Sequence, residues 1–111
     1  MSQFEIVDTS LAGVKHVVRS HYGDNRGWLE RMFCAESLSE AGWEKSINQI
    51  NRTFTEQRGT VRGMHYQNPP HAECKFVNCL YGSVFDVDVD LRKDSPTFLQ
   101  SYGAELSDNN N

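Results

Sequence analysis

The chain has 111 residues, a length that fits one domain and leaves little room for a second. Its formal net charge of −4 argues against nucleic acid as a partner, because phosphate backbones are bound by basic surfaces. No apolar run approaches the ~18 residues of a membrane span, and a hydrophobic share of 38% is enough only for a modest core. A local basic cluster can still hold a small phosphorylated ligand.

The first half of the chain predicts short strands and one helix. Residues 4–22 alternate loosely between apolar and polar side chains, which predicts two or three strands. Residues 23–27 are a turn cluster bracketed by glycines, and residues 28–33 follow as a strand. Residues 36–43 form the one convincing helix, which a glycine ends. Residues 47–55 alternate again, as a strand does.

The second half predicts further strands. Residues 59–67 and 76–80 alternate, and residues 84–91 are the clearest strand, since valines and aspartates occupy opposite faces. Residues 98–106 predict a last strand. Residues 107–111 are polar, and residues 106–111 are expected to be a disordered tail. Short strands separated by turns, with one helix, indicate an all-β sandwich or barrel.

Cysteine usage favours a reducing compartment. Cys34, Cys74 and Cys79 are odd in number and lack the spacing of a disulfide framework. Cys74 and Cys79 are interpreted as small core residues. The first ten residues hold no apolar run and no cleavage pattern, so no signal peptide is predicted. The expected location is the cytoplasm.

Residues 59–75, GTVRGMHYQNPPHAECK, are the stretch in which we expect chemistry. His65 is a candidate general base, because imidazole titrates near neutral pH. Asp86 or Asp88, on a neighbouring strand, is a candidate carboxylate partner for it. The alternative is a histidine that is satisfied by a backbone carbonyl, which carries no function.

A metal site is the weaker interpretation of the same stretch. His65, His71 and Glu73 are ligand types that a divalent transition metal accepts. The two histidines are six residues apart across a Pro-Pro turn, however, whereas metal sites of this kind usually offer histidines one residue apart. We therefore predict no metal and no other cofactor.

Three cations are candidates for an anionic ligand or an enolate: Lys75, Arg62 and Arg26. Taken separately, each is more often a solvated surface charge. The three aspartates of residues 84–91 share one strand face, and burying them without partners is costly. Either that face is wet, or the basic side chains reach it.

Three motifs resemble one family. They are GTVRGMHYQNPPHAECKFVNCLYGSVFDVDVDLRKDSPTF, preceded by GDNRGWLERMF and INQINRTFTEQRGT. They resemble the dTDP-4-dehydrorhamnose 3,5-epimerases and related sugar-nucleotide epimerases over essentially the whole chain. The resemblance implies a cupin-like, jelly-roll type β-barrel or partial barrel, a metal-free site and a homodimer. It also implies proton removal at carbon 3 and carbon 5 of a 4-keto-6-deoxyhexose linked to dTDP, as in the synthesis of dTDP-rhamnose.

Site roles follow from the positions of the motifs. His65 is similar to the family's catalytic base and Lys75 to its enolate-stabilising lysine. The residues similar to those that contact the sugar or the diphosphate are Arg62, Gln49 and Asn51. Arg26 is similar to an arginine that reaches the substrate of the neighbouring subunit.

Two departures from the family pattern stand out. Many members have a glutamate where ungapped matching places Arg31, and Glu30 beside it is expected to face the other way. Family members also continue for a second half-barrel, with a tyrosine acid and an aspartate that pairs with the base. The tyrosines of this chain do not occupy that tyrosine's motif. The alternative to an epimerase is therefore a non-catalytic truncated relative, which binds a nucleotide sugar or serves as one part of a two-chain enzyme. Either predicts a homodimer, with strand exchange or face-to-face packing.

Overall fold

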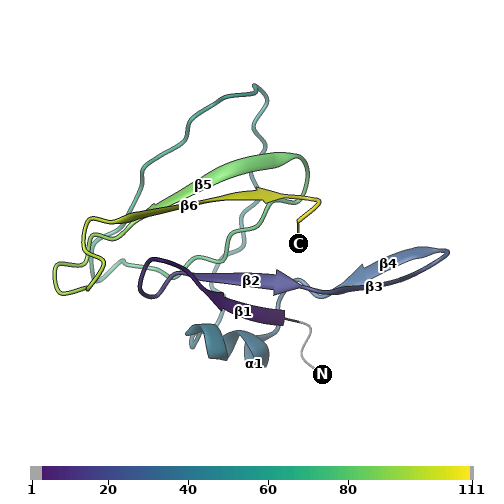
Figure 1. Ribbon diagram of the computed structural model, residues 1–111, viewed down its shortest axis with the longest axis horizontal. Helices are drawn as coiled ribbons and strands as arrows, with labels where there is room; N and C mark the ends of the chain where they lie inside the picture. The colour runs from purple at the N-terminus through teal and green to yellow at the C-terminus, as the bar shows by residue number, and fades with distance from the viewer. Residues whose placement is uncertain (1–3, 111) are drawn as a thin grey trace. The chain divides into compact units, whose positions relative to one another are not determined.

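The structure, a computed structural model, describes residues 4–110 (Figure 1). The chain divides into two compact units. The strand unit comprises Met1–Glu44 and Val77–Asn111, and the loop unit comprises Lys45–Phe76. All helices and strands found in residues 4–110 belong to the strand unit.

The strand unit is built from three antiparallel hairpins and a short helix. Its elements are β1 (Phe4–Asp8), β2 (Lys15–Arg19), β3 (His21–Asp24), β4 (Gly27–Glu30), α1 (Ala35–Leu38), the 3₁₀ helix η1 (Ser39–Ala41), β5 (Ser83–Val89) and β6 (Ser101–Ser107). β1 pairs with β2, β3 with β4, and β5 with β6. The expected all-β class with one short helix is confirmed. No closed barrel forms within the part of the chain that the structure describes.

Glycines set two of the boundaries. Gly27, at φ 135°, follows the turn between β3 and β4, and Gly42, at φ 94°, ends η1 in the left-handed region. Residues other than glycine seldom adopt these backbone angles. The predicted turn at residues 23–27 and the predicted helix stop are therefore both confirmed.

The β5–β6 hairpin shows the alternation that the sequence predicts. Asp86 and Asp88 lie on the half-buried face, with Asp88 opposite Tyr102. The valines Val87 and Val89 lie on the more exposed face. On that exposed face the ring of Phe85 covers Gly103, where an added Cβ would lie 2.6 Å from the ring. Any larger residue at position 103 would displace this ring.

The hydrophobic core of the strand unit is small. Among residues 4–110, the buried apolar side chains are Phe4, Leu11 and Leu38. Near them, the Phe33 and Trp43 rings meet edge to face with centroids 6.0 Å apart. With so few buried side chains, each one matters to stability.

Leu38→Ala should lower the free energy of unfolding by about 2–5 kcal/mol, because it opens a cavity beneath α1. Leu80→Ala is the matched control, since that side chain is 58% exposed and its truncation should cost less than about 0.5 kcal/mol. Urea unfolding followed by tryptophan fluorescence measures both. Equal midpoints for the two variants would contradict the assignment of Leu38 to the core.

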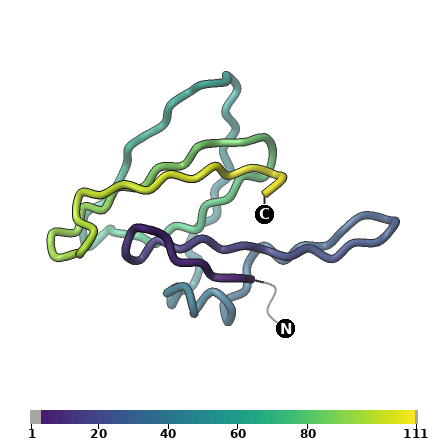
Figure 2. The backbone as a smooth tube through the Cα atoms, viewed as in Figure 1, coloured from purple at the N-terminus to yellow at the C-terminus, as the bar shows by residue number. Residues whose placement is uncertain are grey.

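The strands predicted at residues 47–55, 59–67 and 76–80 are wrong for this structure. A strand exists through its hydrogen-bond ladder, and no ladder within residues 4–110 includes these segments. Figure 2 shows the loop unit as an irregular tube. Cys74 is exposed and Cys79 only half-buried, so neither is the core residue that the alternation predicted.

The chain end is also more ordered than predicted. Leu106 and Ser107 belong to β6. Beyond them the Asp108 amide donates to the Gly82 carbonyl (3.1 Å), and the Gly82 amide donates to the Asp108 carboxylate (3.1 Å). The polar tail predicted as disordered therefore continues a strand and its turn. Asn111, part of that prediction, lies outside the described residues.

Candidate functional site

The loop unit carries most of the predicted site residues and is held by a few side-chain contacts. The hydroxyl of Thr60 donates to the Gln57 carbonyl (2.7 Å), which closes the predicted turn around Gly59. The Arg62 guanidinium donates to the Thr55 hydroxyl (3.1 Å) and to the Phe54 carbonyl (3.1 Å). Arg62 thus ties the segment before the turn to the segment after it.

His65 is exposed, and its ring lies beside Gly63. A Cβ added at Gly63 would lie 3.6 Å from His65 Nδ1, and Gly63 has φ 109°. Glycine is therefore favoured there by the backbone angle, whereas an added Cβ would make only an ordinary contact with the ring. Within residues 4–110 no side-chain hydrogen bond is found for His65, Gln49 or Asn51, so their polar atoms face solvent.

Lys75 lies within a small polar cluster of the loop unit. Its ammonium is 3.6 Å from the Glu73 carboxylate. In the amide orientation that satisfies its neighbours, Gln67 donates to Glu73 (3.1 Å) and to the His71 carbonyl (3.2 Å). The His71 amide donates to the Asn68 carbonyl (2.8 Å), which confirms the predicted turn through the two prolines.

These contacts bear on the metal alternative. Glu73 is engaged by Lys75 and Gln67, and a carboxylate that neutralises an ammonium is a poorer metal ligand. Over residues 4–110, no group of three or more His, Cys, Asp or Glu side chains gathers in a way that could hold a metal ion.

Arg26 belongs to the strand unit, in the turn of the β3–β4 hairpin. Its guanidinium forms two-point contacts with Asp24, the shortest being 2.6 Å. This arginine holds the pKa of the Asp24 carboxyl below its usual range, and the carboxylate in turn raises the pKa of Arg26. The hairpin also carries a stack of His21 on Trp28, with ring centroids 5.0 Å apart.

The hairpin surface is open and aromatic. A cavity of about 280 Å³ is lined by Tyr22, Asp24, Arg26, Gly27, Trp28 and Leu29. The Trp28 side chain is 66% exposed, so the hairpin presents an aromatic face next to an arginine. Such a face suits a nucleotide, because rings stack on tryptophan and arginine binds phosphate.

Glu30 and Arg31, the site of one departure from the family pattern, have different surroundings. Glu30 forms an ion pair with Arg19 at 2.5 Å, and only 8% and 9% of these side chains are exposed. Arg31 is exposed. Glu30 therefore links β4 to β2 through this ion pair, as expected for a side chain that faces away from Arg31.

Asp86 and Asp88 are half-buried and belong to a titratable cluster that sequence reasoning found only in part. The hydroxyl of Tyr102 lies 2.9 Å from His16 Nε2, and the rings meet edge to face. Burial, and then the charge of Asp86, raise the pKa of Asp88, while the charge of His16 lowers it. His16 and Tyr102 were missed because their segments carry no motif, and only the register between strands brings them together.

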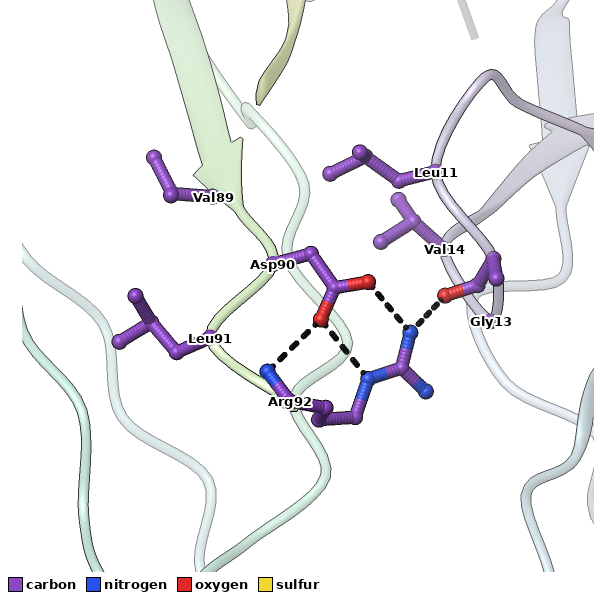
Figure 3. Close-up of a pocket in the computed structure, with 8 residues that line it drawn as sticks. Leu11, Gly13, Val14, Val89, Asp90, Leu91 and Arg92 are labelled. Carbon is purple, nitrogen blue, oxygen red and sulfur yellow. Dashed lines mark hydrogen bonds and ion pairs between the residues drawn. The ribbon is translucent and has the colours of Figure 1, made fainter. Parts of the chain in front are cut away.

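Asp90 is the most heavily hydrogen-bonded carboxylate found in residues 4–110, and Figure 3 shows its contacts with Arg92. It accepts from the Arg92 guanidinium (3.0 Å), from the Ser95 hydroxyl and from the Thr97 hydroxyl (2.6 Å). These donors hold its pKa far below the usual range, Arg92 having the largest effect. Its side chain is 2% exposed, so Asp90 is structural and does not share the role expected for the other two aspartates.

The Asp90 network joins two hairpins. The Arg92 guanidinium also donates to the Ala12 carbonyl, and the Ala12 amide donates to the Thr97 hydroxyl (3.2 Å). The β1–β2 turn is thereby fastened to the segment between β5 and β6. The shallow cavity beside it, about 250 Å³, is lined by Leu11, Ala12, Gly13, Val14, Val89, Asp90, Leu91 and Arg92.

With the geometry in place, comparison with known proteins decides the family. The sequence profile of dTDP-4-dehydrorhamnose 3,5-epimerase matches residues 8–111. The chain belongs to this family. A dTDP-4-dehydrorhamnose 3,5-epimerase from Sinorhizobium fredii is 39% identical over 101 residues, which cover 91% of this chain and 52% of the relative. One from Shigella flexneri is 38% identical over 106 residues, covering 95% of this chain and 58% of the relative.

Solved structures of the family share the fold. The epimerase from Bacillus anthracis, solved with TDP and PPi bound, aligns with a TM-score of 0.90 at 36% identity, over 96% of this chain and 61% of that one. The Legionella pneumophila enzyme, in complex with dTDP-4-keto-L-rhamnose, aligns with a TM-score of 0.77 over 96% of this chain and 56% of that one. The expected cupin-like class is confirmed. The chain spans between half and about three fifths of the length of these relatives.

The predicted site residues are divided between the two units. The loop unit brings Lys75 together with Glu73 and Gln67, and it ties Arg62 to residues 54 and 55. Arg26, Asp86 and Asp88 belong to the strand unit. No helix found in residues 4–110 is long and apolar enough to cross a membrane.

Proposed function

We propose that the chain is an epimerase acting at carbons 3 and 5 of dTDP-4-keto-6-deoxyglucose. The observation that carries this proposal is the family match over residues 8–111, a range that contains His65, Lys75 and Arg62. The ligands named for the Bacillus anthracis and Legionella pneumophila structures, TDP and dTDP-4-keto-L-rhamnose, support a dTDP-sugar as substrate.

The proposed chemistry needs a base and a cation. His65 takes the proton at carbon 3, the electron pair of that C–H bond becomes the enolate, and the negative charge collects on the oxygen at carbon 4. Lys75 stabilises this oxygen, because a fixed positive charge lowers the energy of the enolate. A proton from solvent then adds to carbon 3 on the opposite face, and His65 releases the proton that it took to solvent, so that it can act again. The same sequence at carbon 5 completes the reaction. Every step conserves protons and electrons, and no metal or redox cofactor takes part.

Binding is assigned to four polar side chains. Arg62, Gln49 and Asn51 of the loop unit contact the sugar or the diphosphate in this proposal. Arg26, on the β3–β4 hairpin, reaches the nucleotide sugar of a second subunit. The Arg26 side chain is 86% exposed, which supports that role, but it is paired with Asp24. A phosphate must then compete with Asp24 for this guanidinium.

The deciding experiment is solvent exchange. Purified protein with dTDP-4-keto-6-deoxyglucose in D₂O should incorporate deuterium at carbon 3 or carbon 5, detected by mass spectrometry and proton NMR. No incorporation at high enzyme concentration would remove the catalytic role. Calorimetry then separates the alternative: heat with dTDP but no exchange identifies a binding relative or one part of a two-chain enzyme.

We also infer that the chain associates as a homodimer, with strand exchange or face-to-face packing. Both edges of the β5–β6 hairpin lack a partner strand among the described residues, and Phe85 is 71% exposed. Unpaired edges and apolar faces favour association with another chain. Light scattering at micromolar concentration should give twice the 12.7 kDa chain mass, and a clean monomer would contradict the inference.

The three free cysteines support a cytoplasmic location.

A further inference from the structure

The β3–β4 hairpin is attached to the rest of the strand unit by a narrow base. Ser20 alone separates β3 from β2, and residues 31–34 lead from β4 to α1. Every residue of β3 and the first three residues of β4 are exposed. Figure 1 shows the hairpin extending beyond the end of β2. Packing into the small core therefore does not fix the direction of this hairpin.

One buried ion pair lies at the base. The Arg19 guanidinium, at the end of β2, is 2.5 Å from the carboxylate of Glu30, at the end of β4, and only 9% and 8% of these side chains are exposed. Phe4, itself buried, lies opposite Arg19 on β1. Residues that lie opposite each other on two strands share a face, so the pair has an apolar neighbour. Removing one partner in such a place leaves the other as an uncompensated charge.

Contacts continue along the hairpin from this base towards the tip. Glu30 lies opposite His21, and the His21 ring stacks on Trp28 with ring centroids 5.0 Å apart. Trp28 lies opposite Gly23, where an added Cβ would be 3.3 Å from the Trp28 side chain. Arg26 belongs to the turn that follows. These contacts stiffen the hairpin itself, so the direction of its tip depends on its base.

We propose that Arg19 and Glu30 are positioning residues, which fix the direction of the β3–β4 hairpin and thereby the place that the Arg26 guanidinium reaches. The ion pair joins the two strand ends at a defined distance, whereas the single connecting residue Ser20 restricts the direction of the hairpin only weakly. The proposal rests on the proposed function, in which Arg26 contacts the nucleotide sugar of a second subunit. Arg19 and Glu30 act on that ligand only through Arg26.

Residual dipolar couplings of the backbone amides test the direction of the hairpin without any turnover. In the wild type, the β1–β2 and β3–β4 hairpins should fit one alignment tensor, because the ion pair holds them as one body. Glu30→Gln keeps the size of the side chain and removes its charge, so the two hairpins should then need separate tensors. Glu5→Gln, at an exposed position on β1, is the matched control and should keep one tensor. One tensor in folded Glu30→Gln would overturn the proposal.

The double variant Arg19→Met with Glu30→Leu keeps the test available if Glu30→Gln does not fold. A buried ion pair can often be replaced by apolar side chains of similar volume without loss of stability. This variant should therefore keep the thermal midpoint of the wild type and still need two tensors, because apolar contacts are not directional. A single tensor would mean that packing alone sets the direction of the hairpin, which would overturn the proposal.

The kinetics of deuterium exchange test whether the direction of the hairpin serves Arg26. Glu30→Gln should raise KM for dTDP-4-keto-6-deoxyglucose about 10-fold and leave kcat unchanged, as the loss of a contact made equally in ground and transition states does. In an Arg26→Ala background the same change should have no further effect, because the positioned group is gone. Additive losses would overturn the role through Arg26. Absence of both exchange and dTDP binding in the wild type would instead remove the proposed function, while the dipolar couplings would still support or overturn the fixed direction of the hairpin.

Discussion

Replacing His65 by alanine should reduce deuterium incorporation at carbons 3 and 5 by about 100- to 10,000-fold, the usual contribution of a general base. The structure indicates that this reduction would come from the missing base and not from unfolding of the chain. His65 is exposed, and none of the hydrogen bonds found in residues 4–110 involves its side chain, so its removal should not unfold the chain. The rate of deuterium incorporation into dTDP-4-keto-6-deoxyglucose, compared between wild type and variant at substrate saturation, measures this reduction.

His71→Ala is the matched control for that variant. His71 is exposed, and the interactions found for it use its backbone amide and carbonyl, so the base assignment predicts near wild-type exchange. The metal alternative predicts instead that both histidine variants lose activity together and that added chelator inactivates the wild type. Equal losses in His65→Ala and His71→Ala would therefore contradict the base assignment.

The strand unit could be predicted largely because its signals are local. The alternation of valine and aspartate in β5, the glycine that follows the turn before β4 and the glycine that ends η1 all act within a few residues. Patterns of this kind fix which residues share a face. Prediction of the two faces of β5 succeeded for this reason.

The loop unit was predicted less well, because alternation alone does not make a strand. Residues 47–55 and 59–67 alternate as strands do, yet no ladder within residues 4–110 pairs them. Whether a partner strand is present is a property of the whole fold that a short sequence window does not contain. The candidate residues His65 and Lys75 came from motif positions, and their prediction as site residues does not depend on strand pairing.

The contact between His16 and Tyr102 and the Asp90 network show a second limit to prediction from the sequence. The link between His16 and Tyr102 spans 86 residues, and that between Ala12 and Thr97 spans 85. Contacts so distant depend on the packing of two hairpins, which no local pattern encodes. For Asp90 there was a local signal: Arg92, Ser95 and Thr97 follow it closely and can fold back onto one carboxylate.

Asp90→Asn should be among the most destabilising polar substitutions in the chain. The change leaves the side-chain size almost unaltered, but it removes the charge that the donors of Arg92, Ser95 and Thr97 surround. Hydrogen bonds to a buried charged group are among the stronger ones, so the thermal midpoint should fall by on the order of 10 °C. Loosening of the β1–β2 turn should accompany the loss, because Arg92 and Thr97 also hold Ala12.

The pH dependence of this effect has a definite sign. The pKa of Asp90 is depressed in the folded chain, so its contribution is fully present well above the ordinary carboxyl pKa of about 3.9 and is lost as the pH falls below that value. The difference in urea midpoint between wild type and Asp90→Asn should therefore be large at pH 7 and shrink below about pH 4. Asp94→Asn, at an exposed turn position, controls for the change in net charge and should leave the midpoint nearly unchanged. A difference that stays constant down to pH 3 would mean that the charge of Asp90 does not stabilise the link between the two hairpins.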